Sequence, residues 1–287
     1  MTTTTIPHLD AAPTGRTTRP HPPRGLLHDA WVIARRGMVH LRRQPELLSD
    51  SIGHPVMFVL MFSYVLGGAI SVPGGGEYRE FLMGGVFAQT AVFSAFFGAL
   101  ALASDRKNQA VHRFRSLPLA GGAVLTGHAL TNLLKAVVSV TVASLVGLAV
   151  GWRIDSGPLD AAGGFLLLLA FTFAMTWVGI LVGSAVATPE GVSGIAFVVL
   201  FPATFIASTF VPTDTMPGLV RTLAEWNPTT TLADALRIQF GNPHVAAAAG
   251  DSWPLTHPTA YTAVWIVGIV AVCAPLAIRT YRRSLDR

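Results

Sequence analysis

Long apolar stretches separated by polar segments dominate the chain. Six of these stretches approach the roughly 20 residues that an α-helix needs to cross the hydrocarbon core of a bilayer. They cover residues 51–71, 81–103, 128–150, 161–187, 191–211 and 260–278. The fourth and fifth stretches are joined only by a tight turn, Thr188-Pro189-Glu190. The pattern predicts an all-α polytopic membrane protein with six transmembrane helices.

The segment before the first stretch has a different pattern. Apolar residues recur at every third or fourth position from Leu27 to Leu41, whereas Arg35 and Arg36 lie off that stripe. A basic amphipathic helix of this kind tends to lie in the membrane interface, although a solvated juxtamembrane helix would show the same pattern. The residues before it are rich in Thr, Pro and Arg. We therefore expect a disordered tail over 1–25, an interfacial helix over 26–49 and a transmembrane domain over 50–287.

The distribution of charge predicts the orientation. The chain is 51% hydrophobic and only 12% charged, whereas soluble domains carry about 25% charged residues. Sixteen of the 20 basic residues fall in the N-terminal segment, around the connection after the second span, or in the C-terminal tail. Positive charge accumulates on the cytoplasmic side, so both termini are predicted to be cytoplasmic. The excess of basic over acidic residues follows from this topology and does not require a nucleic acid partner.

The spans lack the groups that convert energy. None has an Asp, Glu or Arg in its middle third, and His54 and Lys135 lie nearer the ends of their spans. The neutral polar residues at depth, Ser94 and Thr176 among them, are expected to make mostly helix–helix hydrogen bonds. The sequence also has no phosphate-binding loop, no metal-ligand spacing and no catalytic motif. We therefore expect no cofactor, metal or catalytic residue on this chain, and an uphill transport would need energy from another chain.

The connection after the second span has an apolar stripe of its own. Val111, Phe114 and Leu117 recur at a spacing of three among basic residues, and Pro118 ends the pattern. A loop that only faced lipid would not need such a stripe. The pattern therefore predicts a docking site for a partner protein.

Two motifs resemble those of the ABC-2 type permeases, in the daunorubicin-resistance (DrrB-like) branch. The first is Asp105 followed by Arg113-Phe114-Arg115-Ser116-Leu117-Pro118, then Ala123-Val124-Leu125 and Gly127. The second is Phe210-Val211-Pro212-Thr213, Met216-Pro217, Asn227-Pro228 and Asp234-Ala235-Leu236-Arg237. The resemblance covers nearly the whole chain. His112 and Ala110 depart from the family pattern, which expects an acid and a small turn residue there.

The resemblance implies a location in the bacterial plasma membrane and a division of labour between subunits. This chain would be a half-channel that pairs with a second permease subunit, for which we expect a homodimer, with a sister chain as the alternative. Two copies of a separate cytoplasmic ATPase would supply the ATP and Mg. The residues expected to couple to that ATPase are Asp105, Arg113, Phe114, Arg115, Ser116, Leu117, Pro118, Arg35 and Arg36. The resemblance also implies short outer-leaflet helices between the fifth and sixth spans, where Glu225, Asp234 and Arg237 are expected to pair.

The function expected is export of an amphipathic or lipophilic compound, such as a drug, an antibiotic or a lipid. Aromatic residues that would line its path are Phe58, Phe62, Phe93, Phe96, Phe97, Phe201 and Phe205, although core packing would explain each of them singly. Two other classes stay open. One is an ion-coupled secondary carrier that uses His54 and Lys135, and the other is a membrane scaffold or an embedded transferase.

Overall fold

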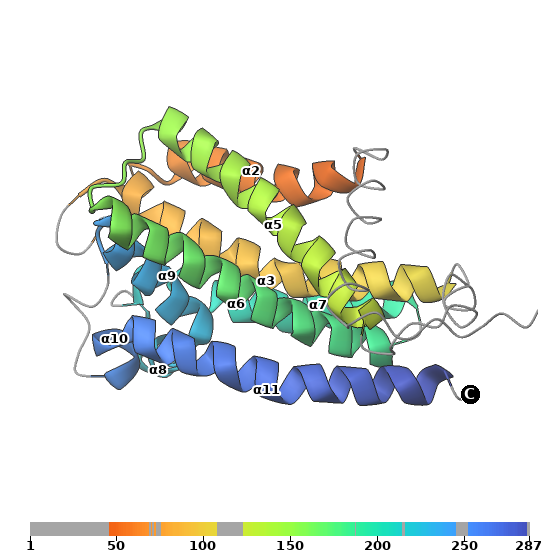
Figure 1. Cartoon of the computed structure of the whole chain (residues 1–287). Helices are drawn as coiled ribbons and strands as arrows, with labels where there is room; N and C mark the ends of the chain where they lie inside the picture. The colour runs from red at the N-terminus through yellow and green to blue at the C-terminus, as the bar shows by residue number, and fades with distance from the viewer. Residues whose placement is uncertain are drawn as a thin grey trace, which may run out of the picture.

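The computed structural model describes residues 46–68, 70, 72, 76–107, 123–186, 188–213, 216–244 and 252–285. These residues form helices joined by loops, with no strand among them (Figure 1). The helices are α2 (Glu46–Val65), α3 (Tyr78–Lys107), α5 (Ala123–Val150), α6 (Pro158–Ala185), α7 (Pro189–Phe205), α8 (Gly218–Glu225), α9 (Pro228–Phe240), α10 (Trp253–Thr256) and α11 (Pro258–Leu285). The all-α prediction is therefore confirmed for the described part of the chain.

Local sequence signals set several helix ends. Helix α7 begins at Pro189, and the Thr188 side chain before it accepts a hydrogen bond from the Gly191 amide. Helix α9 begins in the same way at Pro228, after an Asn227 cap. Proline suits the first position of a helix because its missing N–H would be unpaired there anyway. Helix α9 ends at Gly241, whose φ of 72° is a left-handed conformation that glycine adopts without strain.

Helix α3 is the centre of the bundle. It packs against α2, α5, α6, α7 and α9, while α11 packs against α6 and α9. Helices α3 and α6 approach closely at Gly179 and Gly183 of α6, which lie directly against the α3 backbone at Ala95 and Ala99. Two glycines four residues apart let helix backbones meet, so Gly179 and Gly183 allow α6 to lie directly on α3.

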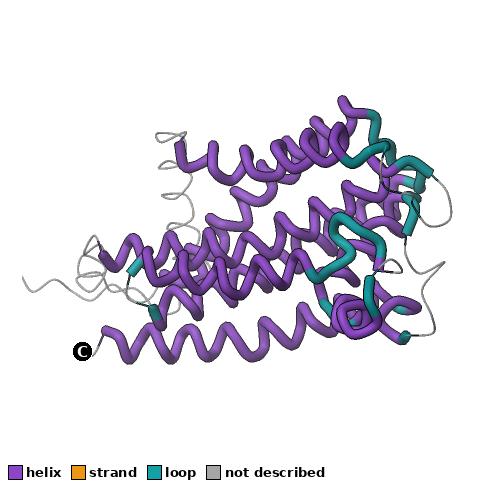
Figure 2. The backbone as a smooth tube through the Cα atoms, turned by 180° about the vertical axis from the view of Figure 1, so that it is seen from behind, coloured by secondary structure: helices purple, strands orange, loops and turns teal. Residues whose placement is uncertain are grey.

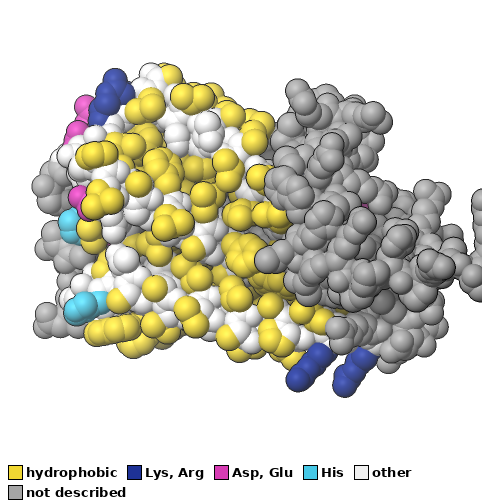
Figure 3. Space-filling model, viewed as in Figure 1, with side chains coloured by type: hydrophobic (Ala, Val, Ile, Leu, Met, Phe, Trp, Pro, Cys, Tyr) yellow, Lys and Arg dark blue, Asp and Glu magenta, His cyan; other side chains and the backbone are white. Residues whose placement is uncertain are grey.

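The connecting loops gather at one end of the bundle. Figure 2 shows most of the described loops at the end opposite the C-terminus. We call these two ends the loop end and the C-terminal end. On the face that Figure 3 shows, the described surface between the two ends is largely apolar, and its charged side chains lie towards the edges. Four helical segments of the described chain are long and apolar enough to cross a membrane, namely Tyr78–Asp105, Val124–Val150, Pro158–Ala185 and Pro258–Tyr281.

Two of the predicted spans are shorter than the sequence suggested. The first was expected over 51–71, but α2 ends at Val65 and a turn follows. The fifth was expected over 191–211, but α7 ends at Phe205. Their apolar helical parts, Ile52–Val65 and Pro189–Phe205, fall below the length of an ordinary span. The predicted tail over 1–25 lies outside the described residues, as does the predicted interfacial helix over 26–49 up to position 45.

Candidate functional site

Aromatic rings from α2, α3 and α7 form one connected surface. On α7, Phe197 stacks on Phe201 with ring centroids 4.7 Å apart, and Phe201 stacks on Phe205 at 5.3 Å. Phe93 of α3 meets Phe201 edge-on at 6.3 Å. Offset and edge-to-face pairs at these distances are the arrangements that aromatic rings prefer.

Phe210, in the turn after α7, connects this row to α2. Its ring lies 5.7 Å from Phe205 and is nearly parallel to Phe62 at 4.3 Å. Phe58 completes the contact, 5.5 Å from both Phe62 and Phe210. We call this set the aromatic ladder; its members are Phe58, Phe62, Phe93, Phe197, Phe201, Phe205 and Phe210.

The α7 side of the ladder is open. Phe197 is 69% exposed and Phe205 48% exposed, and only Val192 and Thr204 of α7 are buried. Phe58 and Phe210 at the other side are buried. Exposed apolar patches of this kind mark contacts with lipid, with another subunit or with an apolar ligand.

The ladder contains five of the seven aromatic residues that the sequence proposed for a substrate path. Phe96 and Phe97 are not part of it, since they contact each other at 5.4 Å and Phe96 packs beside Ala99 and Val192 instead. Phe197 and Phe210 were missed. The spacing of four from Phe197 to Phe201 and Phe205 could have revealed the first, because residues four apart share a helix face.

The end of α7, where the ladder turns, is held by polar groups from later in the chain. The Asn227 side-chain amide donates to the carbonyls of Ala203 at 2.6 Å and Ile206 at 3.4 Å. The Thr230 hydroxyl accepts from the Ser208 amide. Backbone groups at a helix end need such partners. They explain why α7 stops at Phe205 although the sequence stays apolar to Val211.

Arg237 of α9 also bonds this junction. Its guanidinium donates to the carbonyl of Ser208 at 2.7 Å and to the carbonyl of Phe81 on α3 at 2.8 Å. It also lies 3.5 Å from the centre of the Phe81 ring and 2.7 Å from Asp234 Oδ1. Arg237 and Asp234 are fully buried. The expected contact between Asp234 and Arg237 is therefore present, whereas Glu225 does not join it and instead accepts from Arg221 at 2.8 Å.

Most residues predicted to couple to an ATPase lie outside the described residues, namely Arg35, Arg36, Arg113, Phe114, Arg115, Ser116, Leu117 and Pro118. Asp105 is described. It lies in the last turn of α3, 3.3 Å from the His128 ring of α5. Nearby, Lys107 donates to Glu190 at the start of α7 over 2.8 Å. The C-terminal end of the bundle therefore brings the ends of α3, α5 and α7 together.

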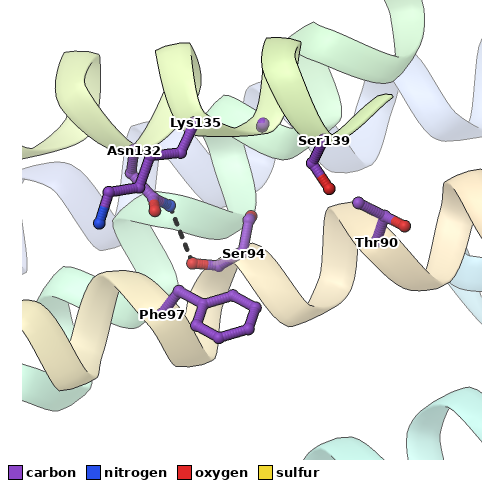
Figure 4. Close-up of a pocket in the computed structure, with 7 residues that line it drawn as sticks. Thr90, Ser94, Phe97, Asn132, Lys135 and Ser139 are labelled. Carbon is purple, nitrogen blue, oxygen red and sulfur yellow. Dashed lines mark hydrogen bonds between the residues drawn. The ribbon is translucent and has the colours of Figure 1, made fainter. Parts of the chain in front are cut away.

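Asn132 of α5 bonds two neighbouring helices inside the bundle. Its side-chain amide donates to the Ser94 carbonyl of α3 (Figure 4) and to the Thr176 hydroxyl of α6, each at 2.9 Å. The Ser94 hydroxyl also donates to the Thr172 carbonyl of α6 at 3.2 Å. Other hydroxyls, such as those of Thr90 and Ser184, donate to a carbonyl one turn back in their own helix. Ser94 and Thr176 therefore make the helix–helix bonds expected of them, whereas a hydroxyl such as that of Thr90 bonds the preceding turn of its own helix.

The chain matches known transporter proteins over most of its length. Residues 28–240 match the ABC-2 type transporter family. The chain is 33% identical to the daunorubicin resistance ABC transporter permease protein DrrB1 of Streptomyces coeruleorubidus, over 87% of this chain and 84% of that one. It is 24% identical to the probable doxorubicin resistance ABC transporter permease protein DrrC of Mycobacterium tuberculosis, over 99% of both chains. The doxorubicin resistance permease protein DrrB of the same organism is 22% identical over 85% of both.

Proposed function

The chain belongs to the ABC-2 type transporter family, and on that premise we propose that it is the permease subunit of a bacterial drug-resistance exporter. It would carry an amphipathic or lipophilic compound out of the cell with energy from a separate ATPase. Three relatives that cover most of the chain are named as daunorubicin or doxorubicin resistance permeases. The observation that carries the proposal is the aromatic ladder, an apolar surface with flat rings suited to stacking on a lipophilic compound.

In the arrangement we propose, the chain crosses the plasma membrane six times. The four long apolar helices would span it fully, and the shorter α2 and α7 would contribute the first and fifth crossings. Helices α8 and α9 would dip into the outer leaflet, because the buried Arg237 can satisfy a backbone carbonyl of the turn after α7 there without water. The C-terminal end of the bundle would face the cytoplasm, in keeping with the basic residues of the N-terminal segment and of the C-terminal tail.

The partners proposed are two copies of a cytoplasmic ATPase and a second permease subunit, in a homodimer. The ATPase would bind the segment around Phe114 together with Arg35 and Arg36, and Asp105 would link that segment to α3. The open face of α7 suits a second copy, because a half-channel must complete its path against another half. A compound between the two halves would then meet Phe197, Phe201 and Phe205 from each side.

Transport in cells that contain the partner tests this function. The chain would be expressed with and without an ABC ATPase encoded beside it, and efflux of a fluorescent anthracycline from loaded cells would be followed. We expect efflux only with both proteins present, and its loss when the ATPase carries a substitution in its phosphate-binding lysine. Efflux by this chain alone, driven by a proton gradient, would overturn the proposal in favour of a secondary carrier.

A further inference from the structure

A small cavity between α3 and α5 is lined in part by the cationic side chain of Lys135. It has a volume of about 20 Å³ and is lined by Thr90, Ser94, Asn132, Lys135 and Ser139, with Phe97 at its wall (Figure 4). A space of this size holds a group as large as one water molecule. The cavity can therefore take a single oxygen-bearing group, while the rest of a ligand lies outside it.

The positive charge of Lys135 lacks a close counter-charge. Within the described part of the chain, Lys135 forms no ion pair or hydrogen bond. Asp105 attracts it electrostatically, but the Asp105 carboxylate lies beside His128, at 3.3 Å. Figure 4 shows the side chain extending along α5 past Asn132, away from Ser139. An uncompensated ammonium in a membrane segment is costly, so binding of an anion at this place is favourable.

The remaining groups of the cavity offer acceptors rather than donors. The hydroxyls of Thr90 and Ser94 each donate to a carbonyl of their own helix. The side-chain amide of Asn132 already donates to Ser94 and Thr176. Their oxygen lone pairs stay available, whereas Lys135 has three donor hydrogens. The cavity is therefore complementary to an oxyanion that carries hydroxyl groups beside it, and it repels a ligand with a cationic amine.

Exposed apolar side chains follow Lys135 along α5. Val138 and Leu145 lie nearer the loop end of the bundle and are 39% and 61% exposed. A ligand held by its oxyanion at Lys135 could place a hydrocarbon chain along them, and burial of each CH₂ group would add to affinity. A free inorganic anion would gain nothing from this stripe.

We propose that the α3–α5 cavity binds the headgroup of an anionic, hydroxyl-bearing phospholipid of the phosphatidylglycerol type. The phosphodiester would lie at Lys135, a headgroup hydroxyl would enter the cavity, and an acyl chain would follow Val138 and Leu145. Phosphatidylcholine and phosphatidylethanolamine fit less well, because their ammonium groups meet the Lys135 charge. This lipid would be a bound component of the subunit and not its cargo, so the proposal does not depend on which compound is exported.

Thermal unfolding of the purified full chain in a neutral detergent tests the proposal. Dioleoylphosphatidylglycerol should raise the melting temperature by several degrees, while dioleoylphosphatidylcholine and inorganic phosphate should not. The rise should disappear in Lys135→Gln and persist in Lys135→Arg. The matched control is Lys107→Gln, which removes the other lysine of the chain at an exposed position and should keep the full rise. An equal rise in Lys135→Gln would overturn the site, and an equal rise with inorganic phosphate would overturn its assignment to a lipid.

A second measurement uses the wild-type chain, so that it remains informative if Lys135→Gln does not fold. The sequence has only two lysines, Lys107 and Lys135. Acylation of each amine by a small reagent can therefore be followed separately by mass spectrometry of the peptides. Phosphatidylglycerol should slow the acylation of Lys135 several-fold and leave that of Lys107 unchanged. Equal rates at Lys135 with phosphatidylglycerol and with phosphatidylcholine would contradict the proposal.

Discussion

Arg237 and Asp234 lie one turn apart on α9 and form an ion pair at 2.7 Å in which neither side chain is exposed. The pair sits where α9 meets both α3 and the end of α7, and Arg237 bonds a carbonyl in each. Removing one partner of a buried ion pair leaves an unpaired charge, at a cost of about 3–5 kcal/mol. We expect Asp234→Asn to fall at the low end of that range, because Arg237 keeps its two carbonyl acceptors.

Thermal unfolding in detergent would measure this effect. The matched control is Glu225→Gln, which breaks a more accessible ion pair with Arg221 on α8. Pairs of that kind contribute about 0.2–1 kcal/mol, so Glu225→Gln should lower the melting temperature much less than Asp234→Asn. Equal effects of the two substitutions would show that the buried pair does not hold the junction.

The same junction shows where prediction from sequence ends. The length of the apolar stretches was enough to predict a helix in the region of every span. Thr188 and Pro189 marked the start of α7. Hydropathy could not reveal the end of α7 at Phe205, because the partners that replace its helical hydrogen bonds, Asn227 and Arg237, come more than 20 residues later. A chain that leaves a helix inside an apolar environment depends on such distant groups, and local pattern does not encode them.

The candidate site, too, can be predicted only in part from the sequence. The phenylalanines of α7 share a helix face at a spacing of four, so their row is visible in the sequence. The contact of Phe210 with Phe62 depends on the turn after α7, and the cavity at Lys135 depends on how α3 and α5 cross. Both features result from tertiary packing. Neither can be found by periodicity within one segment.

Gly179 provides a test of the packing between α3 and α6. A methyl group at this position would overlap the Ala95 backbone of α3, so Gly179→Ala must push the two helices apart. Overpacking of a tight interface costs about 1–3 kcal/mol. Gly268→Ala on α11 is the control, because a methyl group there meets open space. We expect a lower melting temperature for Gly179→Ala alone, and an unchanged value would mean that α3 and α6 are not in close contact.

The aromatic ladder should affect transport more than stability. Phe201 is partly exposed and contacts Phe93, Phe197 and Phe205. If a lipophilic compound stacks there, Phe201→Ala should remove about 0.5–1.5 kcal/mol of that interaction, which lowers affinity roughly two- to tenfold. Leu166→Ala, at a 70% exposed position of α6, should leave transport unchanged. ATPase-dependent efflux measured at several drug concentrations would separate a loss of affinity from a loss of protein.

The orientation of the bundle can be tested with the single cysteine of the chain replaced by serine. Thr256→Cys in this background places a thiol at the loop end, and Lys107→Cys places one at the C-terminal end; both positions are exposed. A membrane-impermeant maleimide should label Thr256→Cys in intact cells. Lys107→Cys should be labelled only after permeabilisation. The reverse pattern would place the termini outside and contradict the proposed topology.

A substitution at Phe114 can separate coupling to an ATPase from folding. It lies in the segment whose apolar stripe and basic residues favour a docking site. Truncation of an aromatic residue at the centre of an interface to alanine often costs more than about 2 kcal/mol of binding free energy. Phe114→Ala should therefore leave membrane insertion and melting temperature intact, while efflux falls and the ATPase no longer responds to the drug. His112→Ala, in the same segment but off the stripe, should have a much smaller effect. Normal efflux by Phe114→Ala would mean that the ATPase docks elsewhere on the chain.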